Sequence, residues 1–180
     1  MNTKIIVDFE ATCCDKNSIP RHQMEIIEIG ACATDNSHNI ISEFQAFIRP
    51  VRHTVLTEFC TSLTAISQLQ VNTAKEFPNI CRQFKKWIWL HENPIFCSWG
   101  AYDKNQLLQD CEYHKMQFPF GGNYTNLKTE YADVIKSKRS FGLGQALRNS
   151  GISFEGTPHR GIDDAKNIAR LLPIIYKYPA

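Results

Sequence analysis

Residues 4–12 read KIIVDFEAT, a short run rich in isoleucine that is followed at once by acidic side chains. Short β-branched runs are typical of buried strands, so we expect a strand over residues 4–9. Side chains two positions apart on a strand share one face, which brings Asp8 and Glu10 together. Carboxylates held this close repel each other unless a cation compensates, and Mg²⁺ prefers such oxygen ligands. The pair alone is also compatible with an ordinary solvated strand end.

Two later segments place further acids beside predicted secondary-structure boundaries. In the segment SWGAYD, Asp103 follows a short apolar run and opens a predicted helix. In the segment HRGIDDA, His159 precedes a helix that contains Asp163 and Asp164. Acids near helix N-termini interact favourably with the helix dipole, so each segment alone also has a structural explanation.

The hydrophobic pattern predicts an α/β fold with one mixed five-stranded sheet flanked by helices. Three strands precede an alternation of helices and strands, and the polar cluster at residues 35–39 predicts a hairpin between the second and third strands. Thr64 is the candidate N-cap of the second of two short helices, and the helix after His159 is predicted to continue through Ile175. The predicted strands are residues 4–9, 24–34, 39–48, 94–99 and 123–127; the predicted helices are two within 57–70, then 75–92, 103–114, one ending near 135, 142–149 and the C-terminal one.

Composition excludes several classes of protein. The chain has 180 residues, of which 43% are hydrophobic and 21% charged, as in ordinary globular proteins, and we expect a single domain over residues 1–180. No apolar stretch approaches the roughly 20 residues that cross a bilayer, and no export signal is visible at the N-terminus. We therefore expect a cytoplasmic protein with no membrane partner. The formal net charge of +2 does not by itself indicate a nucleic-acid-binding protein.

The seven cysteines do not form the pattern of a disulfide framework. Their number is odd, and Cys13 and Cys14 are adjacent, so we expect free thiols in a reducing compartment. Only Cys111 and His114 approach zinc-ligand spacing, and no second pair follows them. Buried, apolar cysteines are therefore expected rather than a structural zinc site.

Taken together, the acidic segments have a specific order: Asp-x-Glu at residues 8–10, then Asp103, then His-x4-Asp at residues 159–164. This order resembles the three exonuclease motifs of the DEDDh family of 3′→5′ exonucleases, which have a ribonuclease-H-like fold. The segment FIRP at 47–50 resembles the end of the third strand in this family. LTEFC at 56–60 and DDAKNIAR at 163–170 resemble the Eri-type exonucleases, and among bacterial relatives the KapD-type proteins are similar. The resemblance covers nearly the whole chain.

The resemblance implies a hydrolase that uses two divalent ions, Mg²⁺ with Mn²⁺ able to substitute. In such sites the ions lower the pKa of an attacking water and stabilise the leaving 3′-oxygen. Imidazole is suited to accept a proton near neutral pH, which makes His159 the implied general base. The family spacing favours Asp164 over Asp163, which we expect on a different helical face. The implied metal ligands are Asp8, Glu10, Asp103 and Asp164.

The same resemblance implies that the terminal nucleotide is held by Glu10, the Ala11 backbone and His159, with Glu10 and Ala11 at its 3′-OH. The expected substrate is a single-stranded nucleic acid, RNA more than DNA, and the expected products are nucleoside 5′-monophosphates. Two alternatives stay open: a DNA exonuclease of the proofreading type, and a non-catalytic regulator that binds RNA or protein. A regulator would be favoured by a degenerate site, whereas all five motif positions are present.

Aromatic side chains near the motifs are candidates for stacking on the terminal base. Stacking of a single-stranded base on an aromatic ring is worth about 1–3 kcal/mol. Phe59 and Tyr102 are the favoured candidates. Trp99 and Phe9 also flank the motif acids, but they fit equally well in a hydrophobic core.

Overall fold

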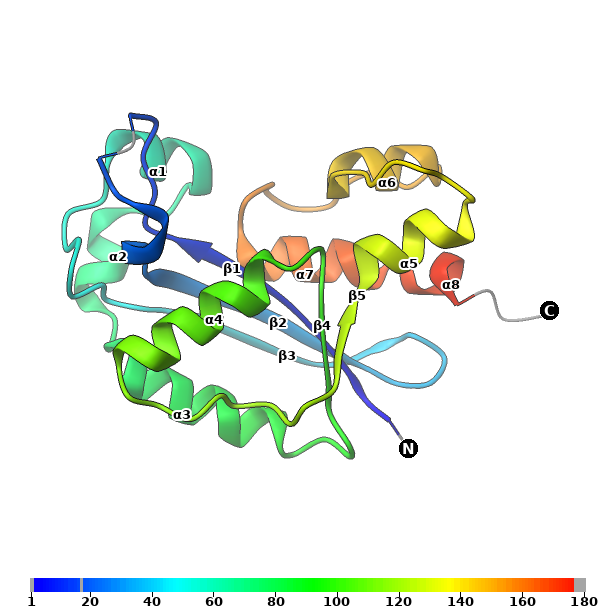
Figure 1. Cartoon of the computed structure of the whole chain (residues 1–180), viewed down its shortest axis with the longest axis horizontal. Coiled ribbons are helices and arrows are strands. Elements are labelled where there is room, and N and C mark those ends of the chain that lie inside the picture. Colours follow the sequence, from blue (N-terminus) through cyan, green and yellow to red (C-terminus); the bar gives the residue numbers. More distant parts are fainter. Residues whose placement is uncertain (1, 17, 177–180) are drawn as a thin grey trace.

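The computed structural model describes residues 2–16 and 18–176, and a mixed five-stranded sheet lies at its centre (Figure 1). The strand order is β3-β2-β1-β4-β5. β1 pairs antiparallel with β2 and parallel with β4, while β2 and β3 form an antiparallel hairpin and β5 pairs parallel with β4. The predicted mixed sheet and hairpin are therefore confirmed. The strands are β1 (Lys4–Ala11), β2 (Ile26–Thr34), β3 (Ile40–Phe47), β4 (Ile95–Ser98) and β5 (Tyr124–Asn126).

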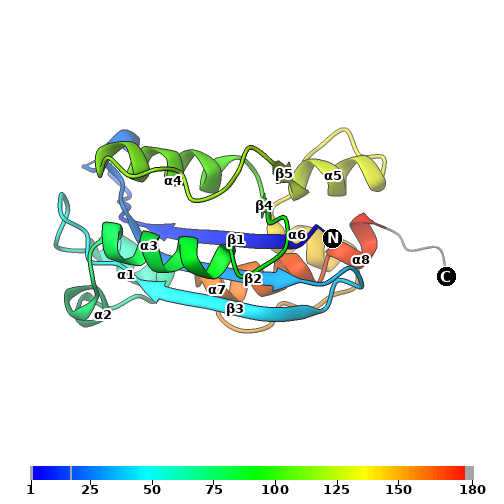
Figure 2. The same ribbon diagram turned by 90° about the horizontal axis from the view of Figure 1, so that it is seen from below.

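Helices cover both faces of this sheet (Figure 2). α3 and α4 pack on one face and α5 to α8 on the other, while α1 and α2 pack near one end of β2. No helix within the described residues combines the length and apolar character that a membrane crossing needs. The helices are α1 (Glu58–Thr64), α2 (Gln68–Thr73), α3 (Phe77–Ile88), α4 (Tyr102–Tyr113), α5 (Leu127–Val134), α6 (Leu143–Asn149), α7 (Gly161–Ala169) and α8 (Leu172–Ile175), with a short 3-10 helix at Arg21–Gln23.

β1 is the central strand, and burial on both faces explains its nearly continuous apolar sequence. Ile5 and Phe9 point into the core beneath α3 and α4, whereas Ile6 points into the core beneath α5 to α8. Because side chains alternate along a strand, Asp8 and Glu10 face the same side as Ile6. The two acids therefore face the layer that contains α7.

α7 lies unusually close to the sheet because glycine occupies both sides of the contact. A Cβ on Gly30 of β2 would lie 1.9 Å from the carbonyl carbon of Gly161, the first residue of α7. A Cβ on Gly161 would in turn lie 2.8 Å from the backbone oxygen of Asp8. Backbone therefore meets backbone here, and the first turn of α7 is seated on β1 and β2.

The cap predicted for α2 was wrong. Thr64 is the last residue of α1, and its hydroxyl donates a hydrogen bond to the Cys60 carbonyl over 2.8 Å. Ala65 then adopts a left-handed conformation with φ of 54°, which ends α1 before a new helix can start. The N-cap of α2 is Ser67, which forms a reciprocal capping box with Gln70.

The long C-terminal helix predicted after His159 was also wrong, because it is divided in two. α7 ends at Ala169 and α8 begins at Leu172. Pro173 has no backbone N–H, and its ring would clash with the carbonyl four residues earlier in a continuous helix. The chain therefore starts a new helix in which Pro173 occupies the first turn, where its missing N–H is tolerated.

Replacing Gly30 with Ala is expected to destabilise the protein, because the new Cβ would overlap the backbone of Gly161. Overpacking in a core costs about 1–3 kcal/mol, and a backbone clash is at the upper end, so we expect a loss of about 3 kcal/mol in the free energy of unfolding. Chemical denaturation measures this loss. Gly122→Ala is the matched control, since a Cβ there meets nothing within 4 Å. Equal denaturation midpoints for the two variants would contradict the close contact.

Candidate active site

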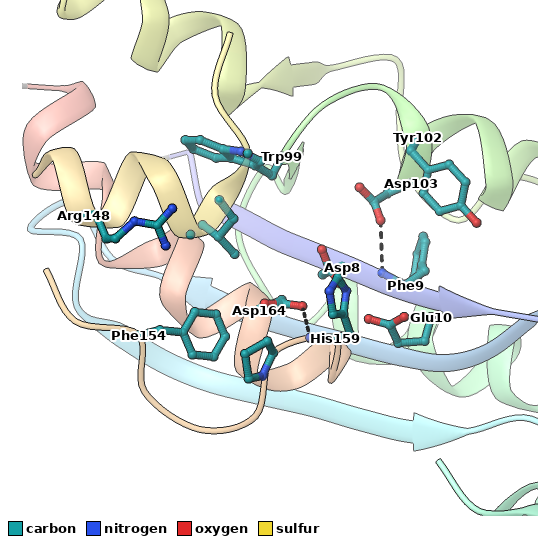
Figure 3. A pocket seen from close by; sticks show the side chains of 14 residues that line it. Asp8, Phe9, Glu10, Trp99, Tyr102, Asp103, Arg148, Phe154, His159 and Asp164 are labelled. Atoms are coloured by element: carbon teal, nitrogen blue, oxygen red, sulfur yellow. Dashed lines mark hydrogen bonds between the residues drawn. The ribbon is translucent and has the colours of Figure 1, made fainter. Parts of the chain in front are cut away.

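The two acids of β1 lie toward the C-terminal end of the central strand, beneath the first turn of α7 (Figure 3). Glu10 is buried and Asp8 is half-buried. Asp8 is paired with Gly30 of β2 and Glu10 with Glu28. The glycine beside Asp8 leaves the space into which α7 fits, so the sheet and the helix meet at these acids.

Asp103 reaches the same place from the first turn of α4 and is buried. Its Oδ1 accepts a hydrogen bond of 3.0 Å from the backbone N–H of Phe9, which lies between the two acids of β1. The turn that leads into α4 is fixed at Gly100, whose φ of 110° favours glycine. The Gly100 carbonyl accepts hydrogen bonds from the Ser98 hydroxyl (2.7 Å) and the Tyr124 hydroxyl (2.6 Å).

α7 and the loop before it contribute Asp164 and His159. The His159 backbone N–H donates to Asp164 Oδ2 over 2.9 Å. His159 has a left-handed φ of 61°, which is uncommon for a residue with a side chain. One side-chain ligand atom from each of Glu10, His159 and Asp164 lies within 4.8 Å of the other two. These three groups are therefore close enough to act on one ion or one small ligand.

Glu28 anchors this loop, and sequence reasoning did not single it out. It is fully buried and accepts hydrogen bonds from the Gly161 N–H (3.1 Å), from Arg160 Nε (3.1 Å) and from Gln45 Nε2 (2.7 Å). A buried carboxylate needs such partners to offset the loss of water. The available signal was an acid in the middle of an otherwise apolar strand, which is unusual unless the acid is paired.

The side chain of Asp163 points away from the cluster of Glu10, His159 and Asp164. Its Oδ2 accepts from the Thr157 backbone N–H over 2.9 Å, and its carboxylate packs where a Cβ on Gly156 would lie. Asp163 is absent from the pocket lining, whereas Asp164 is part of it. This placement agrees with the predicted separation of the two adjacent acids onto different helical faces.

The four acids have raised pKa values, and burial is the largest cause for each. The pKa of Glu10 rises to about 9, that of Asp103 to about 7 and that of Asp164 to about 6. The pKa of Asp8 is also raised well above its ordinary value, by burial and then by repulsion from Asp103. The main-chain hydrogen bonds from Phe9 and His159 oppose the rise at Asp103 and Asp164. Clustered acids of this kind form the anionic, oxygen-rich donor set that a hard divalent cation prefers.

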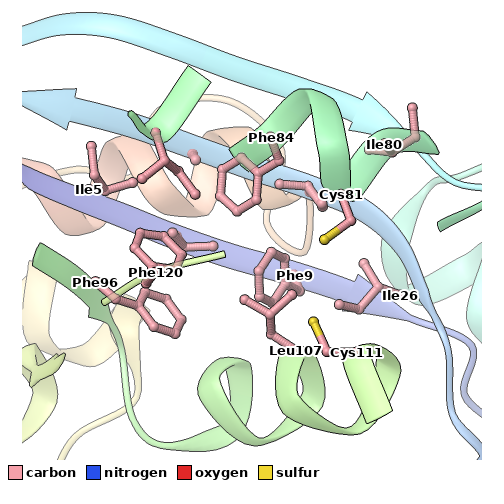
Figure 4. Close-up of a cluster of buried hydrophobic side chains, with 14 of the residues drawn as sticks. Ile5, Phe9, Ile26, Ile80, Cys81, Phe84, Phe96, Leu107, Cys111 and Phe120 are labelled. Carbon is pink, nitrogen blue, oxygen red and sulfur yellow. The ribbon is translucent and has the colours of Figure 1, made fainter. Parts of the chain in front are cut away.

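The aromatic candidates fall in different places. Tyr102 and Trp99 line the pocket, whereas Phe59 on α1 is exposed and lies outside the lining. The Phe9 ring points to the opposite face of the sheet, where it lies 6.4 Å from the ring of Phe84 and near Leu107 (Figure 4). Phe9 is therefore a core residue. Stacking by the other three stays a prediction.

All five motif side chains line one pocket of about 630 Å³ (Figure 3). Ala11 is buried directly after Glu10. The pocket also contains residues that sequence reasoning missed, because neither an exposed arginine nor a loop phenylalanine has a local pattern that assigns it to a site. These residues are Gly142, Leu143, Gly144, Arg148, Phe154 and Pro158.

Comparison with known proteins shows relatives over nearly the whole chain. The exonuclease family RNase_T matches residues 5–172. The human (Homo sapiens) 3′-5′ exoribonuclease 1 is 35% identical over 176 residues, which cover 92% of this chain and 50% of that protein. The probable 3′-5′ exonuclease KapD of Bacillus subtilis is 30% identical over 175 residues, which cover 97% of this chain and 84% of that protein. The chain thus spans about half the length of the human relative and most of the bacterial one.

A solved structure shows the same fold. The nuclease domain of 3′hExo, a DEDDh family member bound to rAMP, superposes with a TM-score of 0.89 and 32% sequence identity. The match covers 97% of this chain and 92% of that one. The ribonuclease-H-like fold expected from the sequence is therefore confirmed.

The raised pKa values predict how Mg²⁺ affects stability. Carboxyl groups of the unfolded chain lose their protons near pH 4, whereas Asp164, Asp103 and Glu10 in the folded protein retain theirs up to about pH 6–9. Without bound ions, the free energy of unfolding therefore falls as the pH rises from about 4 to about 9. A divalent cation bound by the ionised carboxylates would remove this penalty, so we expect Mg²⁺ to raise the unfolding temperature more at about pH 8 than at about pH 6.

Thermal unfolding with millimolar MgCl₂ measures the effect, and KCl of equal ionic strength is the control. An equal rise with both salts, or a larger rise at the lower pH, would contradict the assignment of these acids to an ion site.

Proposed function

Because the chain belongs to the RNase_T exonuclease family and to its DEDDh group, we propose that it hydrolyses single-stranded nucleic acid from the 3′ end, RNA in preference to DNA. Terminal phosphodiesters would be cut one at a time, with release of nucleoside 5′-monophosphates. The observation that carries this proposal is the convergence of all five motif side chains, from segments far apart in the sequence, on one pocket.

The residues that would hold two Mg²⁺ ions, with Mn²⁺ able to substitute, are Asp8, Glu10, Asp103 and Asp164. Ions bound there would lower the pKa of the attacking water and stabilise the leaving 3′-oxygen. The protein fixes the ligands in advance: main-chain N–H groups hold Asp103 and Asp164 in place. All four ligands lie on regular secondary structure, two on β1 and one each on α4 and α7, which restricts their movement.

His159 is the group that would accept the proton of the attacking water. Its backbone is fixed by the bond to Asp164, while its side chain is exposed and close to Glu10. The exposed imidazole is able to pass the proton on to solvent after each turnover. Only a base within hydrogen-bond reach of the reacting water is effective, and the placement of a His159 ring nitrogen within 4.8 Å of Glu10 and Asp164 oxygens supports this role.

The terminal nucleotide would be held at the Glu10 end of the pocket. Glu10, the Ala11 backbone and His159 would contact the terminal nucleotide, with Glu10 and Ala11 at its 3′-OH, as the family resemblance implies. Tyr102 lines the pocket beside Asp103 and presents a partly exposed ring, which supports it as the residue that stacks on the terminal base. Phe59 lies outside the lining, so its contribution is less well supported than that of Tyr102.

Two competing functions are a DNA exonuclease of the proofreading type and a non-catalytic regulator. The regulator is disfavoured because none of the five motif side chains is replaced or displaced from the pocket. The preference for RNA is supported by the human relative, which is named as an exoribonuclease, and by the rAMP bound in the related nuclease domain.

We also place residues 1–180 in a single exonuclease domain, supported by the family match over residues 5–172 and by one continuous sheet. For its location we propose the cytoplasm. All seven cysteines are free thiols, which a reducing compartment would preserve.

Purified protein with Mg²⁺ and 5′-labelled single-stranded oligonucleotides tests this function. We expect a ladder of products that shorten from the 3′ end, faster for RNA than for DNA of the same sequence, and no ladder when EDTA removes the ions. Faster cleavage of DNA would favour the proofreading alternative. Binding of the oligonucleotide without any shortening would favour the regulator.

Adjacent acids provide a matched pair of variants for the site. Asp164→Asn removes a proposed ligand charge and is expected to lower kcat/KM on an RNA oligonucleotide by about 100-fold or more. Asp163→Asn keeps an oxygen able to accept from Thr157 and is expected to retain activity within about threefold, as for substitutions away from a site. Equal losses in the two variants, measured on folded protein, would rule out the distinction between them.

A further inference from the structure

One end of the pocket has no role in the chemistry proposed above. The carboxylates and His159 occupy its middle, and Tyr102 borders one end (Figure 3). Arg148 on α6 borders the opposite end, and Trp99 and Phe154 lie on the same side as Arg148. This second end, the α6 end, is lined by Trp99, Leu143, Arg148, Phe154 and Pro158.

Arg148 is the one basic side chain other than His159 among the residues that line the pocket. It is exposed, and no residue of the described part of the chain forms a hydrogen bond or an ion pair with its guanidinium. The guanidinium extends over Gly144, where Nη1 lies 3.6 Å from the position of an added Cβ.

Several other arginines have carboxylate partners: Arg49 pairs with Glu76, Arg52 with Glu25, Arg160 with Glu28 and Arg170 with Glu155. All five donors of Arg148 are therefore available to a ligand.

The surroundings of Arg148 are apolar and already fixed in place. The Trp99 indole N–H donates to the Phe141 carbonyl over 3.0 Å, and its ring lies 5.7 Å from that of Tyr131. Phe154 is half-buried against the core cluster beneath α5 to α8. A cation beside two fixed aromatic rings suits a ligand that has both an anionic group and a flat apolar surface, as a nucleotide does.

The direction of the substrate follows from the proposed function, on which this inference rests. With the terminal nucleotide at the Glu10 and Tyr102 end, the bond to be cut lies at the carboxylates. The strand must then continue away from Tyr102, which leads it to the α6 end. The next phosphate along the strand would lie beyond the carboxylates, where a positive charge is needed to balance it.

We propose that the α6 end of the pocket binds the penultimate nucleotide, that Arg148 binds the phosphate on the 5′ side of that nucleotide, and that Trp99 and Phe154 contact its base and sugar. The planar guanidinium forms two parallel bonds to phosphate oxygens, a geometry that lysine cannot reproduce. The site selects for a phosphate rather than for a base, so it serves any sequence.

Two dinucleotide substrates distinguish the effect of this phosphate from that of the phosphate at the cleaved bond. ApA has only the scissile phosphate and is hydrolysed to adenosine and AMP. pApA has a second phosphate at the proposed position and is hydrolysed to two molecules of AMP, with the same bond broken by the same water. The wild-type protein is expected to have a higher kcat/KM for pApA than for ApA.

Arg148→Gln is expected to lower the ratio of the two kcat/KM values, pApA over ApA, by about 10- to 100-fold, the usual loss for a hydrogen bond to a charged group. Arg148→Lys should give an intermediate ratio, because lysine keeps the positive charge but cannot form the two parallel hydrogen bonds of a guanidinium. Arg82→Gln on α3 is the charge-matched control, since Arg82 is exposed and, within residues 2–16 and 18–176, bonds only Asn79 of its own helix. The ratio in Arg82→Gln should equal that of the wild type.

A structural role for Arg148 is distinguished by the same measurement. An arginine in the last turn of a helix also stabilises the helix dipole, so thermal unfolding is recorded for each variant. A purely structural defect would lower kcat/KM for ApA and pApA equally and leave their ratio unchanged. That outcome would overturn the proposal.

A binding measurement on variants that cannot cleave distinguishes failure of this proposal from failure of the proposed function. The affinity of a 5′-fluorescent RNA hexanucleotide is measured for Asp164→Asn and for Asp164→Asn combined with Arg148→Gln, so that no cleavage interferes. Weaker binding in the double variant supports the α6 site even if the wild-type protein cleaves neither dinucleotide, in which case only the exonuclease assignment fails. Equal affinities overturn the α6 site, whatever the wild-type activity.

Discussion

Backbone meets backbone where the first turn of α7 crosses β1 and β2, since neither Gly30 nor Gly161 has a side chain to keep them apart. Glu28 then fixes the orientation of that turn, because its buried carboxylate accepts from the Gly161 N–H and from Arg160. The acid on α7 can reach the acids of β1 only at this short separation. Completion of the site depends on this contact, since α4 and β1 already bring Asp103, Asp8 and Glu10 to the same edge, and the contact adds Asp164 and His159.

The site places four carboxylates where burial and mutual repulsion disfavour their ionised forms. Main-chain donors favour the ionised form of only two of them, Asp103 and Asp164. The fold therefore holds these groups at some cost to its own stability, and divalent ions are the partners able to relieve that cost. Perturbed acids gathered in a cleft are characteristic of functional sites for this reason.

The charges of the pocket are divided, with acids in the middle and at one end an arginine that has no ion-pair partner among the described residues. A polyanion would meet repulsion at the carboxylates in the absence of ions, while Arg148 would attract it with or without them. In the proposed binding mode this division would give the pocket a direction, with the terminal base near Tyr102 and the remaining strand near α6. In the proposed mode, Arg148 would contribute to binding alone, whereas Glu10 and His159 would serve both binding and hydrolysis.

Sequence alone determined the five strands, the hairpin and the five motif residues. These features depend on local alternation, turn chemistry and the order of a few residue types along the chain. Local rules could also have located the helix boundaries at Ser67 and Pro173. Thr64 competed with Ser67 as the cap, and the continuous apolar periodicity of the C-terminal segment concealed the break before Pro173.

Only the tertiary structure decided that Glu28 anchors the loop before α7, that Asp163 faces Thr157, and that Arg148 lines the pocket. Each of these facts is a contact between segments far apart in the sequence or a choice between adjacent positions on a helix. Hydrophobic periodicity records which face of an element is buried, and it holds no information about which distant element covers that face.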